Sequence, residues 1–111
     1  MRLPNCENAV VSLEKIRDYC LSNEHSRGKH KAKVFKSALG LDSGDSKMLK
    51  RIIEEAILLN DAEETFKDKY GIRYIVDFEY SMKDKKAKIR TCWIVKTNEN
   101  FPRLTSCYIK L

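Results

Sequence analysis

The chain has 111 residues, of which 22 are Lys or Arg and 16 are Asp or Glu, giving a formal net charge of +6. This length fits one compact domain and excludes a large multidomain enzyme, and the 42% of hydrophobic residues is enough for a core. No apolar run approaches the roughly 18–20 residues that a membrane helix needs, and the N-terminal residues lack a basic-then-apolar signal segment, so we expect a cytoplasmic protein that binds no membrane.

Apolar residues at helical spacing predict three helices in the first half of the chain. The first covers residues 12–20 with Ser12 as N-cap, the second covers about 29–39, and the third follows the capping sequence of residues 42–46. Gly40 suits the position that ends the second helix. The residues that share a face are Leu13, Ile16, Arg17 and Cys20 on the first helix, Ala32, Phe35 and Leu39 on the second, and Leu49, Ile52, Ile53, Ala56, Ile57 and Leu59 on the third.

After residue 60 the apolar period changes from about 3.6 to 2, which predicts strands. Strands are expected over residues 70–80, 87–96 and 104–111, with a polar hairpin connection at 81–86 and a loop at 97–102. Ser106 and Tyr108 should share one face of the last strand, and Arg90 should point away from the face of Trp93.

The order of these elements defines the fold class. Helices followed by strands predict a single α+β domain over residues 1–111. We expect two to three N-terminal helices packed on a C-terminal antiparallel sheet of three to four strands.

The positive charge is concentrated in one stretch. Residues 23–51 contain eight basic and three acidic residues, a balance of +5, and both histidines lie there. We expect this stretch to face phosphates, the alternative being a solvated helix face. The residues expected to contact the phosphates of bound RNA are His25, Arg27, Lys29, Lys33, Lys36 and Thr105.

The four cysteines suggest a disulfide or a zinc site, and their spacing fits neither. Cys6, Cys20, Cys92 and Cys107 form no CxxC pair, and their spacing to the histidines matches no common zinc pattern. We therefore expect reduced, structural thiols and no metal. The chain also lacks a glycine-rich phosphate loop and the GxSxG and HExxH motifs, so no cofactor is expected.

The remaining polar residues suit metal-independent cleavage of RNA. That reaction needs a base for the 2′-hydroxyl, a proton donor for the leaving 5′-oxygen, and cations or hydroxyls around the phosphate. His30 is the candidate acid–base group, because histidine titrates near neutral pH. Lys31 and Arg90 are candidates to stabilise the phosphoryl charge. Ser106 and Tyr108 are candidates to donate hydrogen bonds to the phosphate or to position the scissile bond.

Three segments resemble a family of small, functionally uncharacterised bacterial domains: GKHKAKVFKSALGL, YGIRYIVDFE and IRTCWIVK…FPRLTSCYI. The resemblance extends from about Asn5 to Leu111. Some members occur alone, and others look like C-terminal domains of toxin-like or phage-associated proteins. The order of helices and sheet also resembles the barnase–EndoU–colicin–RelE group of RNases. Residues 29–33 and the later Ser106-Cys107-Tyr108 are similar to a helical Lys/His pair and a Ser-x-Trp strand element of colicin D, with Tyr108 in the place of the Trp.

These resemblances imply an endoribonuclease toxin of a bacterial toxin–antitoxin or polymorphic-toxin system. RNA would be the substrate, and a small acidic antitoxin or immunity protein would be the partner. Two other functions stay open on the residues alone. One is a non-catalytic nucleic-acid-binding module in which tyrosines and Trp93 stack on bases, and the other is a domain that binds an acidic protein.

Overall fold

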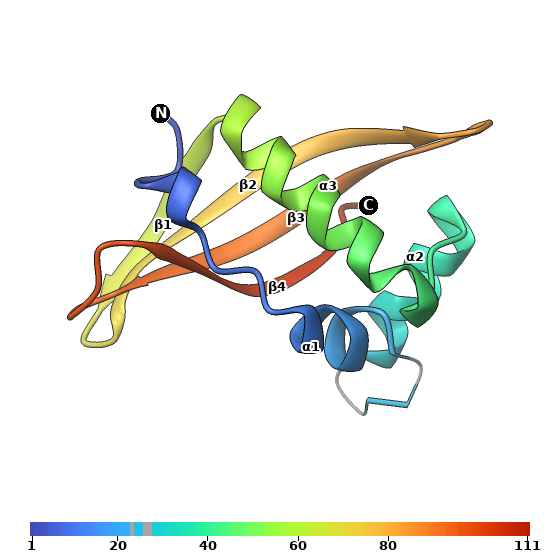
Figure 1. The fold of residues 1–111 in the computed structure, drawn as a ribbon, viewed down its shortest axis with the longest axis horizontal. Helices are drawn as coiled ribbons and strands as arrows, with labels where there is room; N and C mark the ends of the chain where they lie inside the picture. Colours follow the sequence, from blue (N-terminus) through green and yellow to red (C-terminus); the bar gives the residue numbers. More distant parts are fainter. Residues whose placement is uncertain (23, 26–27) are drawn as a thin grey trace.

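A four-stranded antiparallel sheet, in the order β1-β2-β3-β4, carries the helices on one of its faces (Figure 1). This is the arrangement in a computed structural model, which describes residues 1–22, 24–25 and 28–111. The predicted α+β class, with helices first and sheet second, is confirmed. Within the described residues, no helix has the length and apolar character needed to cross a bilayer. Arg27, one of the residues expected to contact phosphates, lies outside the described part of the chain.

The helical half consists of two longer helices and several short turns. Their bounds are η1 Cys6–Asn8, α1 Leu13–Lys15, η2 Ile16–Cys20, α2 Lys29–Leu39, η3 Ser43–Asp45 and α3 Ser46–Leu59. Helix α2 has the predicted bounds, because Gly40 takes the left-handed conformation (φ 72°) that ends it. The Ser12 hydroxyl accepts a hydrogen bond from the backbone N–H of Lys15 at 3.2 Å, so the predicted N-cap is confirmed.

The expected first helix is not a regular α-helix. After α1 the chain widens into the π-helical turn η2, in which the N–H of Leu21 donates to the carbonyl of Ile16 at 2.9 Å. The wider turn buries both Cys20 and Leu21. It leaves Arg17 exposed, although regular helical spacing predicts Arg17 on the face of Ile16.

Helix α3 begins as predicted and ends with one difference. The Asp42 carboxylate accepts from the N–H of Gly44, and the Asp45 carboxylate accepts from the N–H of Asp42, which makes a capping box. Ile53 and Ile57 are fully buried, as the stripe predicts. The prediction was wrong for Leu59, which is 74% exposed, because two residues beyond Ile57 the helix surface has turned toward solvent.

The sheet has four strands, one more than the three for which the apolar pattern gives residue ranges. The strands are β1 Ala62–Asp68, β2 Gly71–Met82, β3 Lys85–Lys96 and β4 Pro102–Ile109. Strand β1 carries no apolar alternation because, after Ala62, all of its residues are exposed. The β2–β3 connection is shorter than the expected 81–86, since Ser81 and Met82 still pair with β3 and Lys83 turns with φ 56°.

The two faces of the sheet differ in what covers them. Val76, Thr91 and Cys107 form a row across β2, β3 and β4 on the helix-covered face, where Trp93 and Phe35 join the core. The side chains of their neighbours along each strand, such as Asp77, Arg90 and Tyr108, lie on the opposite face, which we call the open face. Arg90 lies on the open face, as predicted.

Candidate functional site

A row of polar residues crosses three strands on the open face. Asp77 on β2 pairs with Arg90 on β3, and Arg90 pairs with Tyr108 on β4. The Nε and Nη2 atoms of Arg90 donate to the two carboxylate oxygens of Asp77 at 2.8 and 2.9 Å. The side chains of Arg90 and Asp77 are only 23% and 28% exposed, so the sheet surface fixes this bidentate pair in place.

Lys31 reaches this row from helix α2, which packs against β3 and β4. Its Nζ lies 4.3 Å from the centre of the Tyr108 ring. Lys31 is half-buried, and among the described residues no carboxylate lies within ion-pair distance of its ammonium group. The favourable contact with the ring face holds this cation at the edge of the open face, where an anion can approach it.

Ser106 lies in the neighbouring row, next to Cys92. Its hydroxyl oxygen is buried, and within the described structure it has no hydrogen-bond partner. Burial raises the pKa of the Cys92 thiol, although the cations Lys31 and Arg90 act in the opposite direction. The row therefore offers an unpaired hydroxyl beside a protonated thiol, and an unpaired buried hydroxyl indicates an available donor.

The charges around Tyr108 leave a positive balance. The hydrogen bond that Arg90 donates to Asp77 is the largest influence that raises the pKa of Arg90, and the Tyr108 hydroxyl adds to it. Arg90 therefore remains charged at any ordinary pH. The cluster holds two cations, Arg90 and Lys31, and one carboxylate, Asp77, so it can attract a phosphate-sized anion.

The structure brings four of the five predicted catalytic residues together and places the fifth apart. Lys31, Arg90, Ser106 and Tyr108 form the cluster described above. His30 lies on the exposed side of α2, one residue before Lys31. The cluster therefore contains the cations and hydroxyls of the predicted set. The histidine of that set, His30, lies outside the cluster at the position before Lys31 on α2.

The residues expected to contact flanking phosphates are dispersed over three environments. Lys29 and Lys33 are exposed on α2, close in sequence to Lys31. Lys36 forms an ion pair with Asp42 at 3.1 Å. Thr105 is the extra residue in a bulge of β4, between the pairs Cys92–Ser106 and Trp93–Leu104.

His25 has a structural role near the start of α2. Its ring packs edge-on against Tyr19 at a centroid distance of 4.6 Å. Its Nδ1 accepts a hydrogen bond from the backbone N–H of Gly28 at 3.1 Å. These contacts hold the chain where α2 begins, so His25 supports the helix that carries Lys31.

Sequence reasoning missed Asp77 and Cys92 as members of this cluster. A signal for Asp77 was present, because the expected hairpin connection at 81–86 is centred between residues 83 and 84. Residues equally distant from that centre pair across the hairpin, and Asp77 and Arg90 are equally distant and of opposite charge.

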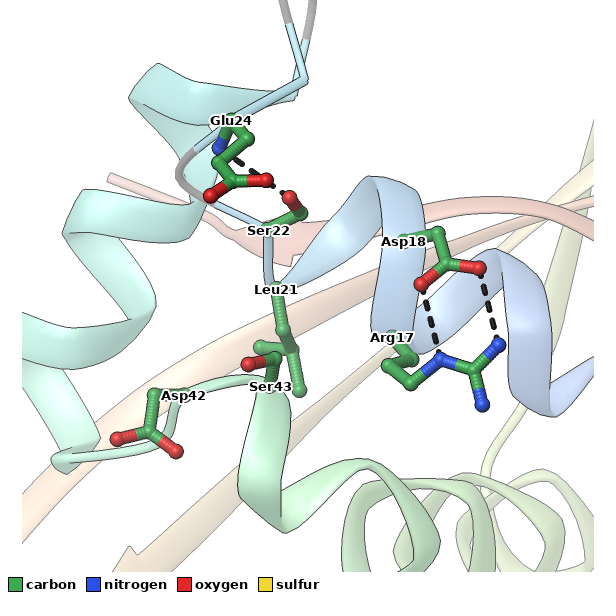
Figure 2. Close-up of a pocket in the computed structure, with 7 residues that line it drawn as sticks. All are labelled: Arg17, Asp18, Leu21, Ser22, Glu24, Asp42 and Ser43. Carbon is green, nitrogen blue, oxygen red and sulfur yellow. Dashed lines mark hydrogen bonds and ion pairs between the residues drawn. The ribbon is translucent and has the colours of Figure 1, made fainter.

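The hollow in Figure 2 is different in character from this cluster. It has a volume of about 370 Å³ and lies between the segments at η2 and η3. Asp18, Glu24 and Asp42 line it, and Arg17, the one cation among its described lining residues, is paired with Asp18 at 2.9 Å. An acid-lined hollow repels phosphate, and none of the predicted site residues that the structure describes lines it.

The cysteines are free thiols in the structure. Cys20 and Cys107 are buried in the core, where the hydrogen bond with Cys20 and burial raise the pKa of Cys107 well above its usual value. In the described residues, no group of three His, Cys, Asp or Glu side chains could hold a metal ion.

The Asp77–Arg90 pair predicts how stability depends on acid. The hydrogen bond from Arg90 lowers the pKa of Asp77 below its unfolded value, so the carboxylate stabilises the fold above about pH 4. That contribution is lost as the pH falls through the lowered pKa. We expect Asp77→Asn to cost about 1 kcal/mol at pH 7 and to differ little from wild type near pH 2, as measured by urea unfolding. Asp84→Asn, in the exposed β2–β3 turn, is the matched control, and an equal loss there would contradict the assignment.

The chain is a small α+β domain with a positively charged cluster at the junction of one helix and the open face of a four-stranded meander. The model of the family described as Domain of unknown function (DUF6883) matches residues 2–111, and the chain belongs to that family. A comparison with curated proteins found no match, and a comparison with solved structures also found none.

Proposed function

We propose that this domain is a metal-independent endoribonuclease that acts as a toxin in the bacterial cytosol. The cluster of Lys31, Arg90, Ser106 and Tyr108 would bind the scissile phosphate. The observation that supports the proposal most is the position of Lys31, a half-buried cation over the Tyr108 ring with no carboxylate near it in the described structure. Such a cation beside Arg90 suits an anion with several oxygens, as a phosphodiester has.

The proposed reaction assigns each group one task. The imidazole of His30, which lies outside the cluster on the exposed side of α2, takes the proton of a 2′-hydroxyl that bound RNA brings to it, and the oxygen of that hydroxyl attacks phosphorus. The bond from phosphorus to the 5′-oxygen breaks, and the Tyr108 hydroxyl supplies the proton that this oxygen needs. Lys31 and Arg90 stabilise the charge that develops on the phosphoryl oxygens, and Ser106 donates a hydrogen bond to one of them.

The test is incubation of the purified protein with total RNA in the presence of a chelator. We expect fragments that end in a 2′,3′-cyclic phosphate. Lys31→Met keeps the length of the side chain without its charge and should lower the cleavage rate at least tenfold, and His30→Ala should abolish cleavage. Lys47→Met, on α3 and outside the cluster, is the matched control and should cleave at the wild-type rate.

A second function is favoured by the same cation if the cleavage experiment fails. The cluster would then bind nucleic acid without cutting it, and Lys31→Met would weaken salt-dependent RNA binding while the RNA stays intact. Intact RNA with no binding by the wild-type protein would contradict both functions.

The proposed toxin also requires a partner that keeps it inactive in its host. A small acidic antitoxin or immunity protein would be attracted by the net charge of +6 and would cover the basic side of α2 and the cluster. Toxicity on expression that is rescued by His30→Ala, or by a co-expressed acidic partner, would support this role.

A further inference from the structure

The hairpin of β2 and β3 extends beyond the outer strand of the sheet. Strand β1 pairs with β2 only from Gly71 to Val76, whereas β2 continues to Met82 and remains paired with β3 throughout. In the described structure, residues 77–82 of β2 therefore have no strand on their β1 side. Every second residue of that segment directs its backbone N–H and C=O away from β3, toward an empty position.

The unpaired segment lacks the features that usually protect a sheet edge. Strand β1 is protected, because it is charged, exposed and interrupted by a bulge between Glu64 and Phe66. Residues 77–82 contain no Lys or Pro, their two acids Asp77 and Glu79 are each paired with a cation of β3, and their register with β3 has no bulge. A regular, unguarded edge is a template for another strand.

A groove runs between this edge and helix α3. Two hollows, of about 320 and 420 Å³, share Ile52, Glu55 and Tyr80 as lining residues and so form one continuous groove. Its apolar wall is made by Ile52, Ala56 and Leu59 from the helix and by Phe78 from the strand. The 74% exposed Leu59, which the sheet does not cover, stands at one end of it.

The charges of the groove favour an acidic occupant at its other end. Lys47 and Arg51 line the hollow beside Tyr80. Glu79 is neutralised by Lys86 at 3.1 Å, which leaves Glu55 as the one unpaired acid among the described lining residues. A second copy of the chain would bring another charge of +6 and be repelled, whereas an acidic partner would be attracted.

We propose that residues 77–82 of β2 and the α3 groove bind an extended segment of an acidic partner protein, which adds to the sheet as an antiparallel strand. Its backbone pairs with β2, and its alternate apolar side chains enter the groove between Ile52, Leu59 and Phe78. A strand antiparallel to β2 begins beside the C-terminal end of β2, where Lys47 and Arg51 line the groove near Tyr80. The N-terminal end of the bound segment therefore carries the acidic residues. The site meets the Lys31 cluster only at Asp77, whose side chain pairs with Arg90 on the open face, and residues 78–82 continue away from the cluster toward the hairpin turn, so strand addition does not depend on RNase activity.

The probe is a labelled peptide of about ten residues in which Val and Thr alternate after two N-terminal aspartates. Binding to the full chain should shift the backbone amide signals of residues 77–82 in NMR spectra. N-methylation of the peptide amides that face β2 should abolish binding, and methylation of the alternate set should leave it unchanged. Equal binding of the two methylated peptides, or no binding of the unmodified one, would overturn the proposal.

Two helix variants test where the side chains of the peptide bind. Leu59→Glu should weaken peptide binding at least tenfold, and the protein should still fold because this side chain is largely exposed. Leu58→Glu is the matched control: Leu58 is also exposed on α3 but does not line the groove, so binding should be retained. A wild-type protein that dimerises, loses the dimer on Leu59→Glu and binds no peptide would show that the occupant is a second copy, which would overturn the proposal.

Discussion

Gly71→Ala should destabilise the fold by about 3–5 kcal/mol, because the start of β2 leaves no room for a side chain. Gly71 has φ 150°, a conformation that residues with a Cβ rarely adopt. A Cβ there would lie 2.2 Å from the carbonyl oxygen of Val95 and 2.8 Å from the Cα of Lys96. Both are backbone atoms of β3, so relief of the clash requires the β2–β3 pairing to open.

Gly40→Ala is the matched control for this variant. Gly40 also has a positive φ, of 72°, but a Cβ there would meet no atom within 4 Å. Its substitution should cost about 1–2 kcal/mol, the strain of the left-handed conformation alone. The difference between the two variants, measured by urea unfolding, isolates the clash with β3. Equal losses would show that the backbone of β3 moves freely, against our expectation.

The parts of the fold that the sequence predicts well are those that depend on local signals. Helix α2 has its predicted bounds because Gly40 ends it and Ala32, Phe35 and Leu39 supply one buried face. The alternation around Trp93 places Arg90 on the opposite face without any knowledge of the tertiary structure. The shared face of Ser106 and Tyr108 follows from the same rule.

The parts that the sequence does not predict depend on contacts between distant segments. The cation of Lys31 over the Tyr108 ring results from the packing of α2 against the sheet, which periodicity along either segment cannot specify. Strand β1 is held by its hydrogen bonds to β2 and buries almost nothing, so it has no apolar pattern to detect. The candidate site was therefore predictable as a set of residue types, and its geometry required the fold.

Thr91→Val should cost about 2–4 kcal/mol, although it replaces one buried β-branched residue with another of similar shape. Thr91 is fully buried, and its Oγ1 donates to the carbonyl oxygen of Val76 at 2.8 Å. The same oxygen accepts from the Nε1–H of Trp93 at 2.8 Å. Valine removes both hydrogen bonds and leaves the indole N–H of Trp93 buried without a partner, which costs more than the added apolar surface contributes.

Thr91→Ser and Trp93→Phe separate the hydrogen bonds from the packing. Serine keeps the hydroxyl and loses one methyl group, so it should cost only about 1 kcal/mol. In the Trp93→Phe background no indole N–H remains to be orphaned, and Thr91→Val should then cost about 1 kcal/mol less than it does in the wild type. Urea unfolding of the four proteins in this cycle measures the coupling. Additive losses would mean that the Trp93 hydrogen bond contributes nothing to stability, and the cost of Thr91→Val would then come from the hydrogen bond that the Thr91 hydroxyl donates to Val76.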